Sequence, residues 1–443
     1  MTQELSIRET PIPGLLLLSL PVHGDARGWF KENWQREKMV GLGLPDFHPV
    51  QNNVSFNEKA GVTRGIHAEP WDKYVSVAAG KIFGAWVDLR EGESFGNVFT
   101  AELDSSSAIF VPRGVANAFQ TLVENTAYSY LVNDHWSPVT EYTFVNLADE
   151  TLAIEWPITL DKAEISGKDH AHPALADVTP IKPRKTLILG ANGQLGRALV
   201  ARLPAATAWD IEEFDFSDPE SYAKVNWRDF DTIINAAAYT QVDQAETEQG
   251  RRDAWRLNAH AVALLAQTAV AHDLTLVHVS SDYVFDGMQE VHATDELFAP
   301  LGVYGQSKAA GDVAVSVVPK HYIVRTSWVI GDGPNFIKTM QSLAEKGVDS
   351  SVVDDQIGCL TYTADLADGI AELLRSKASY GTYNITSGGE PRSWYEIARQ
   401  AFADAGHDPG RVRATNTEAY AEGRSLAPRP LFSTLAQGRR PSQ

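Results

Sequence analysis

The stretch KTLILGANGQLGRALVARL, residues 185–203, decides the fold of the second half of this chain. An apolar run is followed by Gly190, Gly193 and Gly196 and then by helical periodicity. In a dinucleotide-binding turn the first glycine permits a tight turn, the second lets the backbone approach a pyrophosphate, and the third lets helix and strand pack closely. The phosphates would lie at the helix N-terminus, where free N–H groups favour anions. The stretch predicts a strand, a phosphate-binding turn and a helix.

The rest of the second half repeats this alternation of strand and helix. The apolar runs DTIINAAA (231–238), TLVHVSSDYVF (275–285) and YIVRTSWVI (322–330) are separated by helical stretches. Continuous apolar strands between helices are typical of a parallel sheet covered on both faces. Residues 185–443 therefore predict an α/β Rossmann domain. Acidic residues follow the glycine turn, and Asp210 or Asp215 could hold an adenosine ribose or the adenine.

A tyrosine and a lysine follow in the segment YGQSK (304–308). Tyr304 and Lys308 are four residues apart, so on a helix they share one face. A cation beside a phenol lowers its pKa, and a tyrosine tuned in this way is a good proton donor to a carbonyl oxygen. Ser281 could hydrogen-bond the same oxygen. The alternative is an ordinary surface pair on an amphipathic helix.

The first half has a different pattern. From residue 11 to 157, short strand-like runs such as VQNNVSF (50–56) and KYVSVAAGKIFGAWVDL (73–89) are separated by Gly and Pro. This pattern is typical of an all-β sandwich or barrel. A polar, proline-containing segment at 166–185 then resembles a linker. We expect two domains, residues 1–180 and residues 185–443, the second with a small C-terminal substrate-binding part.

The composition excludes several classes of protein. The chain has 443 residues and a formal net charge of -19, which argues against a general nucleic-acid binder. Its single cysteine, Cys359, excludes an internal disulfide framework and any cysteine-rich zinc site. No apolar run is long enough to span a bilayer. We expect a cytoplasmic protein with no membrane partner.

The segment TRGIHAEPWDKY (63–74) raises three alternatives for His67: a metal ligand, a catalytic base or a buried histidine. Metal sites on β domains often use two histidines separated by one residue, and none occurs near residue 67. Arg64 and Lys73 supply positive charge for an anionic ligand. A histidine near neutral pH can remove a proton next to a ketone, Lys73 can stabilise the enolate, and Tyr130 can return the proton. The base explains this neighbourhood best.

Residues 185–430 resemble dTDP-4-dehydrorhamnose reductase, an extended short-chain dehydrogenase/reductase family. The matching motifs are GANGQLG, INAAAYTQVDQAE, SSDYVFDG, YGQSKAAG, VRTSWVIGDGPNFIKTM and VVDDQIG. The resemblance implies that Tyr304 is the proton donor, that Lys308 orients the ribose, and that Ser281 assists. The implied cofactor contacts are Gly190, Asn192, Gly193, Gln194, Leu195, Gly196, Asp215, Ala236, Ala237, Tyr239, Tyr304 and Lys308. The implied substrate contacts are Asp282, Val284, Arg325, Trp328 and Asn335.

Residues 11–180 resemble dTDP-4-dehydrorhamnose 3,5-epimerase, which implies a jelly-roll (cupin-like) sandwich. The matching motifs are GDARGWFKE, VQNNVSF, RGIH, AGKIFGAWVDLREGESFG, FVPRGVANAFQ and LAIEWP. The resemblance implies that His67 is the base, oriented by Asp169, with Tyr130 as the acid and Lys73 supporting the enolate. The implied substrate contacts are Arg27, Glu32, Gln51, Asn53, Arg64, Asn117 and Glu141. Asn117 stands where many relatives have a histidine.

Together the resemblances imply a bifunctional enzyme acting on a dTDP-sugar. The first domain would invert C3 and C5 next to a C4 ketone, and the second would reduce that ketone with NADPH, or with NADH. No ligand set for magnesium or another metal is evident. A homodimer through the first domain is implied by the epimerase resemblance alone. Two alternatives are a reductase with a β domain that only binds or dimerises, and the same chemistry on another dTDP-deoxysugar.

Overall fold

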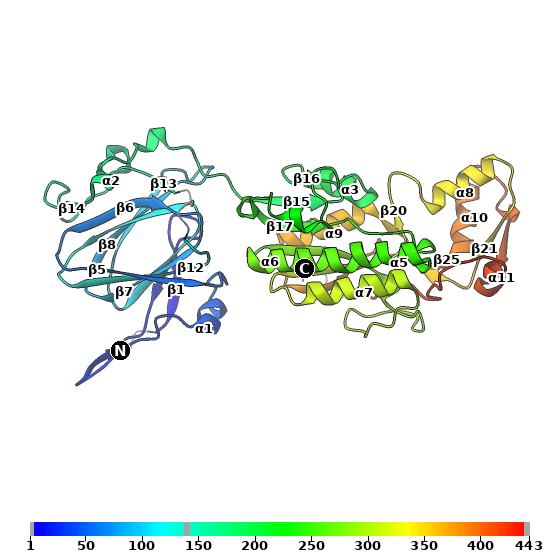
Figure 1. Ribbon diagram of the computed structural model, residues 1–443, viewed down its shortest axis with the longest axis horizontal. Coiled ribbons are helices and arrows are strands. Elements are labelled where there is room, and N and C mark those ends of the chain that lie inside the picture. Colours follow the sequence, from blue (N-terminus) through cyan, green and yellow to red (C-terminus); the bar gives the residue numbers. More distant parts are fainter. Residues whose placement is uncertain (1–3, 137–141, 438–443) are drawn as a thin grey trace. The chain divides into compact units, whose positions relative to one another are not determined.

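The computed structural model describes residues 4–136 and 142–437. Its contacts divide the chain into two compact units, Met1–Pro183 and Arg184–Gln443, which are described separately below (Figure 1). Glu141, one of the implied substrate contacts, lies outside the described residues. Within the described ranges, none of the helices combines the length and apolar character that a membrane span requires.

The first unit is a sandwich of two sheets. One has the order β1-β2-β10-β7-β12-β5 and the other β13-β6-β11-β8-β9, with β14 beside β6. The strands of the first sheet are β1 (Ser6–Glu9), β2 (Leu16–Ser19), β10 (Ser107–Val111), β7 (Lys73–Ala79), β12 (Thr126–Val132) and β5 (Gln51–Asn57). Those of the second are β13 (Thr143–Phe144), β6 (Val62–Ala68), β11 (Val115–Thr121), β8 (Ile82–Asp88), β9 (Val98–Leu103) and β14 (Glu164–Ile165). A separate hairpin, β3 (His23–Asp25) and β4 (Gly28–Phe30), and two short helices, α1 (Arg36–Gly41) and α2 (Gly167–His170), complete the unit.

The core of this unit lies between the two sheets. Val75, Trp86 and Tyr128, from three different strands, belong to one buried cluster there, as expected when alternate side chains of facing sheets point inward. The opposite face of the β6 sheet is covered by the end of the unit, where Leu147 and Val178 belong to a second cluster with Ile66.

This covering segment, residues 145–181, is attached to the sheet on both sides of α2. Before the helix, β14 pairs in parallel with β6. After it, Ile181 forms a parallel bridge with Arg90. The Ile181 N–H donates to the Leu89 carbonyl at 2.7 Å, and the Ile181 carbonyl accepts from the Glu91 N–H at 2.9 Å. Helix α2 is therefore held between two anchored points of the chain.

The second unit is built on a parallel sheet with the order β16-β15-β17-β18-β19-β24. The chain leaves β15 for β16 on one side and then returns to β17 on the other, so the strand order reverses between β15 and β17. Ligands of such sheets bind at the carboxyl ends of the strands at this reversal. The strands are β15 (Lys185–Leu189), β16 (Thr207–Trp209), β17 (Phe230–Asn235), β18 (Thr275–Ser281), β19 (His321–Thr326) and β24 (Gly381–Asn384).

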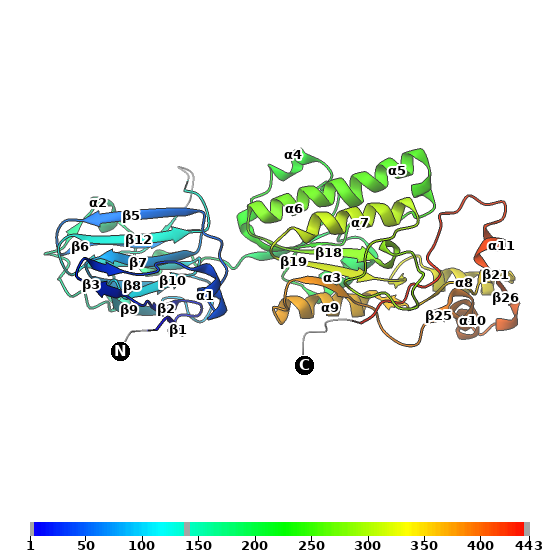
Figure 2. The ribbon, with the colours of Figure 1, turned by 90° about the horizontal axis from the view of Figure 1, so that it is seen from below.

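Helices cover both faces of this sheet. Leu265 of α6 and Val315 of α7 pack on one face, whereas Leu199 of α3 and Leu366 of α9 pack on the other (Figure 2). The helices are α3 (Gln194–Arg202), α4 (Pro219–Tyr222), α5 (Glu248–Trp255), α6 (Ala261–Ala271), α7 (Val303–Ser316) and α9 (Thr363–Arg375). The helical stretches expected between the apolar runs thus form the two outer layers of a Rossmann domain.

A smaller part of the second unit is formed mainly by residues after β19. Met340, Phe402 and Val412 belong to its own buried cluster. Its elements are β20 (Val329–Ile330), α8 (Phe336–Glu345), β21 (Ser350–Val353), β22 (Ile357–Gly358), β23 (Thr361–Tyr362), β25 (Arg392–Ser393), α10 (Trp394–Asp404), β26 (Val412–Thr415) and α11 (Thr417–Ala421). The predicted fold class, an antiparallel sandwich followed by a parallel α/β domain, is confirmed.

Candidate active sites

His67 lies on β6 beside a carboxylate from the covering segment. Its Nε2 is 2.8 Å from Asp169 Oδ1. Asp169 is on α2, where its N–H donates to the hydroxyl of the N-cap residue Ser166 at 3.1 Å. Only 9% of the Asp169 side chain is exposed, so the carboxylate is fixed in place. With Nε2 donating to Asp169, Nδ1 is the basic nitrogen of His67.

A cavity of about 850 Å³ lies against His67 and is also lined by Arg64, Tyr142, Phe144 and Asp169. Phe144 pairs with His67 in the β13–β6 ladder, and the two rings meet edge to face with centres 5.4 Å apart. A cavity of this size is typical of small-ligand sites. The predicted base is therefore both oriented and accessible to a ligand.

Lys73 begins β7 and is the centre of a buried polar cluster. Its Nζ lies 2.6 Å from Glu69 Oε1, donates to Asn117 Oδ1 at 2.7 Å and is 5.2 Å from the centre of the Tyr130 ring. Asn117 is the register partner of His67 in the β11–β6 ladder. Directly opposite residues of such a ladder project to the same side of the sheet. Lys73, Asn117 and Tyr130 therefore lie together, on the side of the sheet that carries His67.

Burial shifts the pKa values of Lys73 and Tyr130 in opposite directions. It lowers the pKa of Lys73, while the adjacent Glu69 carboxylate opposes the change. Burial, reinforced by the Glu69 charge and opposed by Arg64, raises the pKa of Tyr130 to about 12. Tyr130 therefore keeps its proton at neutral pH, as a proton donor requires.

Several predicted residues of the first unit are not among those that line the cavity against His67; Lys73, Asn117 and Tyr130 lie in their own buried cluster, and four others lie elsewhere. Arg27 lies in the turn of the β3–β4 hairpin, where its side chain is 88% exposed and paired with Asp25. Glu32 follows the hairpin and pairs with Lys38. Gln51 and Asn53 lie on β5, where the Gln51 amide donates to Asn53 Oδ1 at 2.9 Å.

The glycine turn of the second unit follows β15, at the reversal of strand order. Gly190 has a φ of 76°, and a Cβ there would lie 2.8 Å from the Ala237 backbone. A Cβ at Gly196 would lie 2.0 Å from the Gly190 carbonyl oxygen. Gly193 is the N-cap of α3 and offers no side-chain cap to its first N–H groups. The turn therefore has the close packing and the helix N-terminus that a dinucleotide pyrophosphate needs.

The carboxylate beside this turn is Asp210 rather than Asp215. Asp210 follows β16, and its Oδ2 accepts the Asn192 N–H at 2.8 Å. Asp215 Oδ1 instead accepts both the N–H and the hydroxyl of Ser217 within its own turn. Asp210 was the other candidate that the sequence left open for the ribose.

Two more predicted cofactor contacts follow β17. Ala237 lies against Gly190, as described above. Tyr239 is fixed by the buried Asn258, whose Oδ1 accepts the Tyr239 N–H at 2.9 Å and whose Nδ2 donates to the Tyr239 carbonyl at 3.1 Å. The structure thus brings the loops after β15 and β17 together.

Tyr304, near the start of α7, meets Ser281 at the end of β18. The Ser281 hydroxyl donates to Asp282 Oδ1 at 2.8 Å, and a hydrogen bond between Ser281 and the Tyr304 phenol acts on the pKa of that tyrosine. Burial and the Asp282 charge raise the pKa of Tyr304 to about 12, and the bond with Ser281 opposes this. The expected lowering of this pKa by Lys308 is not observed.

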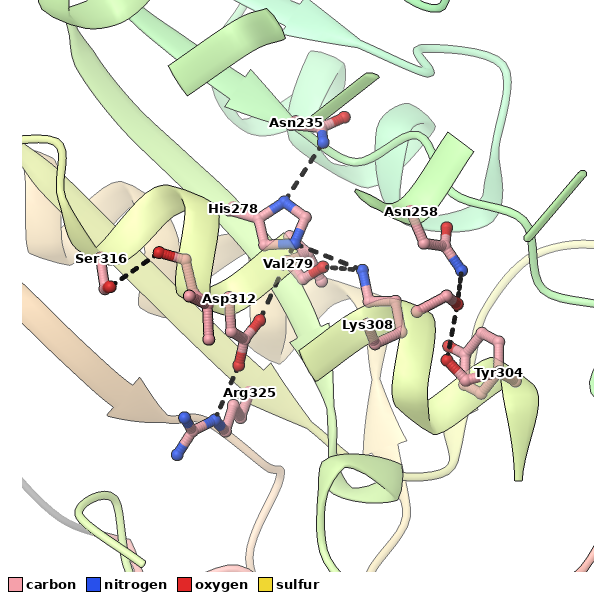
Figure 3. Close-up of polar contacts among 11 residues, drawn as sticks. Asn235, Asn258, His278, Val279, Tyr304, Lys308, Asp312, Ser316 and Arg325 are labelled. Atoms are coloured by element: carbon pink, nitrogen blue, oxygen red, sulfur yellow. Dashed lines mark hydrogen bonds and ion pairs between the residues drawn. The ribbon is translucent and has the colours of Figure 1, made fainter. Parts of the chain in front are cut away.

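The position of Lys308 explains the difference. Its Nζ donates to the Val279 carbonyl at 2.7 Å and lies 3.5 Å from His278 Nε2. Figure 3 shows the ammonium group directed at these two residues rather than at Tyr304. Burial lowers the pKa of Lys308 to about 8. The four-residue spacing correctly placed Lys308 on the same helix as Tyr304. Its ammonium group, however, contacts His278 and Val279 of the neighbouring strand β18.

Arg325 is not available to a sugar nucleotide, which corrects the role implied by the resemblance. It is 4% exposed, and its Nε donates to Asp312 Oδ2 at 3.1 Å (Figure 3). Its Nη1 donates to the Thr294 carbonyl at 2.9 Å. Asp312 also lies 3.9 Å from His278. Arg325 therefore belongs to a buried polar network beneath Lys308.

A groove of about 790 Å³ is lined by Asp243, Tyr283, Trp394 and Arg429, among other residues. Trp328, a predicted substrate contact, stacks on Trp394 with ring centres 3.8 Å apart. The groove joins the Rossmann part to the smaller C-terminal part and is large enough for a nucleotide sugar.

Three further predicted substrate contacts are buried or serve as a helix cap. Val284 is fully buried against Phe285, so its side chain does not reach a ligand. Asn335 caps α8 by accepting the Lys338 N–H at 3.0 Å. Asp282 is 3% exposed, and burial raises its pKa to about 6.

Two residues beside the first site were not anticipated from sequence spacing. Glu69 holds Lys73, and His172 Nε2 lies 3.7 Å from Asp169 Oδ1. The ring of His172 is 5.3 Å from that of His67. The available signal for His172 was the His-x-His pattern at residues 170–172, directly after Asp169. The buried His278 and Asp312 carried no comparable signal.

Comparison with known proteins gives a separate match for each unit. The family model described as dTDP-4-dehydrorhamnose 3,5-epimerase matches residues 9–177, and the one described as RmlD substrate binding domain matches residues 184–440. A Streptococcus pyogenes protein described as an RmlC homolog is 57% identical over 180 residues, which cover 39% of this chain and 90% of the relative. A dTDP-4-dehydrorhamnose reductase of Aggregatibacter actinomycetemcomitans is 38% identical over 268 residues, which cover 57% of this chain and 90% of the relative.

A solved structure also matches the second unit. It is a dTDP-4-dehydrorhamnose reductase from Bacillus anthracis in complex with NADP, with 35% identity and a TM-score of 0.53. The match covers 58% of this chain and 91% of that structure.

Proposed function

Because this chain belongs to the dTDP-4-dehydrorhamnose 3,5-epimerase family over residues 9–177 and to the RmlD substrate binding domain family over residues 184–440, we propose that it performs two consecutive reactions on one dTDP-linked 4-ketosugar. The chain is a bifunctional enzyme of dTDP-rhamnose biosynthesis, both isomerase and oxidoreductase. One observation carries the assignment of residues: each unit holds an oriented proton-transfer group, His67 with Asp169 and Tyr304 with Ser281. Both groups suit chemistry at or beside a ketone.

At the first site, His67 removes a proton from the carbon next to the C4 ketone. Asp169 accepts the hydrogen bond from Nε2 and stabilises the imidazolium that forms. Lys73, held by Glu69 and Asn117, places its charge at the enolate oxygen. Tyr130, whose pKa is about 12, returns a proton to the carbon. The ketone is essential because it acidifies the C3 and C5 hydrogens.

At the second site, NADPH supplies a hydride to C4. Tyr304 donates its phenolic proton to the C4 oxygen, and Ser281, hydrogen-bonded to Tyr304, orients the same oxygen. The glycine turn, with Gly190 and Gly196 too close to their neighbours for any side chain, holds the pyrophosphate. The NADP found in the Bacillus anthracis relative supports this cofactor.

The hairpin β3–β4 supports a homodimer through the first unit. Figure 1 shows it, in dark blue, projecting from the sandwich, and its Trp29 and Phe30 are 48% and 65% exposed. Arg27 and Glu32, which are absent from the His67 cavity, would reach the substrate of a second copy. Light scattering of the intact protein tests this: a monomer at assay concentration would exclude it.

We also propose a cytoplasmic enzyme, because its lone Cys359 is buried and forms no disulfide.

The decisive experiment separates the two reactions. Supplied with dTDP-4-dehydro-6-deoxyglucose in D2O and no NADPH, the wild type should incorporate deuterium at C3 and C5, and His67→Ala should not. If the wild type incorporates none, the first unit is not an epimerase. With NADPH added, NMR of the product identifies the deoxysugar, and a product other than dTDP-rhamnose would overturn the proposed pathway.

A further inference from the structure

A second histidine completes a group of three potential metal ligands around the base of the first site. His67, Asp169 and His172 each offer one ligand atom, and these atoms all lie within 4.8 Å of one another. The Nε2 atoms of His67 and His172 lie 2.8 Å and 3.7 Å from the same oxygen, Asp169 Oδ1. Two imidazoles and a carboxylate are ligands that Zn²⁺ and similar ions prefer.

The distances suit a small tetrahedral ion. Bonds of about 2.0–2.1 Å from zinc to nitrogen or oxygen separate neighbouring ligand atoms by roughly 3.3 Å. The two distances to Asp169 Oδ1, 2.8 Å and 3.7 Å, lie on either side of that value, and all three ligand atoms lie within 4.8 Å of one another, so the two imidazoles must move toward each other to complete the site. The cavity against His67 leaves the fourth position open to water.

The surroundings hold the three side chains in this arrangement. The His172 ring stacks on Phe144 with centres 4.6 Å apart, and Phe144 also contacts the His67 ring edge to face. Asp169 and His172 are each only 9% exposed. Both residues belong to the covering segment, which is anchored on either side of α2. The ligands are thus preorganised rather than gathered from mobile loops.

We propose that His67, Asp169 and His172 form an inhibitory site for a divalent transition-metal ion such as Zn²⁺, which stops the epimerase reaction but not the reductase reaction. The inhibition rests on the proposed function of His67. An ion on Nε2 displaces the proton that this nitrogen gives to Asp169, and the neutral imidazole then carries its proton on Nδ1. No nitrogen of His67 remains free to accept a proton from the substrate.

Direct binding is tested on the intact, metal-free protein without substrate. Co²⁺ should give the intense visible absorption of a tetrahedral site, and calorimetry should show one strong Zn²⁺ site per chain. His172→Gln should weaken binding at least about tenfold, since loss of a ligand costs more than the loss of a supporting residue. The exposed neighbour His170 provides the matched control, His170→Gln, which should bind like the wild type. Absence of Co²⁺ absorption, or equal binding by His172→Gln, would overturn the site.

Inhibition is then measured for both reactions of the same protein. Zn²⁺ should stop deuterium incorporation, with each variant normalised to its own metal-free rate, while NADP-dependent oxidation of dTDP-rhamnose continues. Half-inhibition of His172→Gln should need at least about ten times more Zn²⁺ than half-inhibition of His170→Gln. Equal inhibition of both reactions would contradict the proposal. If the metal-free wild type exchanges no deuterium, the proposed epimerase function fails, whereas the Co²⁺ and calorimetric results judge the metal site independently.

Discussion

Replacing Glu69 by glutamine would test how much the buried ion pair between Glu69 and Lys73 stabilises the first unit. Glutamine keeps the shape of the side chain and can still accept the Trp71 indole N–H, which donates to Glu69 at 2.6 Å. Lys73 would lose the carboxylate 2.6 Å from its Nζ, and both side chains are less than 10% exposed. Removing one partner of a buried pair costs about 3–5 kcal/mol. We therefore expect Glu69→Gln to lower the free energy of unfolding of the first unit by about 3–5 kcal/mol at pH 7.

The loss should depend on pH with a definite sign. Burial already lowers the pKa of Lys73, and Glu69 opposes the change, so the variant lowers it further. Between the folded pKa and the unfolded value of about 10.4, the unfolded chain binds more protons than the folded chain. Stability therefore rises with pH across this window, and the window is wider in the variant. The deficit of Glu69→Gln should shrink as pH rises from the folded pKa of Lys73 in the variant to that in the wild type.

Hydrogen exchange of β7 measures this effect without interference from the second unit, because Lys73 is the first residue of that strand. The control is Glu164→Gln, which breaks the exposed pair with Lys59 and should change stability by less than about 1 kcal/mol. Two results would refute the reasoning: a Glu69→Gln loss below about 1 kcal/mol at pH 7, or a loss that stays constant with pH.

Three further predictions concern the second unit. Tyr304→Phe should abolish NADPH oxidation and leave deuterium exchange intact; if exchange also stops, the two sites are not independent. Gly193→Ala should raise KM for NADPH and lower the melting temperature less than Gly196→Ala, because the new Cβ would lie 3.2 Å from the Gly190 carbonyl oxygen at position 193 but 2.0 Å from it at position 196; equal melting temperatures would contradict this. Burial raises the pKa of Asp282 to about 6, so its contribution to stability is lost as pH rises from about 4 to about 6. The difference in unfolding free energy between wild type and Asp282→Asn, measured by urea denaturation, should follow that window.

Local patterns predicted the fold class because each one is set by residues close in sequence. The glycine turn at Gly190 lies at the end of β15, and the apolar runs form the parallel sheet. The strand-like runs of the first half form two antiparallel sheets for the same reason. These patterns depend on side-chain period and backbone sterics, which act over a few residues.

The surroundings of the sites depended on contacts between distant segments. His172 reaches His67 only because the covering segment lies over β6, and no spacing rule contains that information. Helical spacing put Tyr304 and Lys308 together on α7 but could not reveal the Val279 carbonyl that accepts the hydrogen bond from the Lys308 ammonium group. Arg325 matched a substrate-binding position by motif, yet Asp312 holds it in the interior.

The anchoring of Ile181 has a mechanical consequence for a chain with two active units. The connection to the second unit leaves the sandwich directly after Ile181, whose N–H and carbonyl are both bonded to the strand-end segment around Arg90. A force transmitted through this connection therefore acts on those bonds before it reaches α2. The two hydrogen bonds of Ile181 therefore stand between a pull on the connection and the hydrogen bond that joins Asp169 to His67.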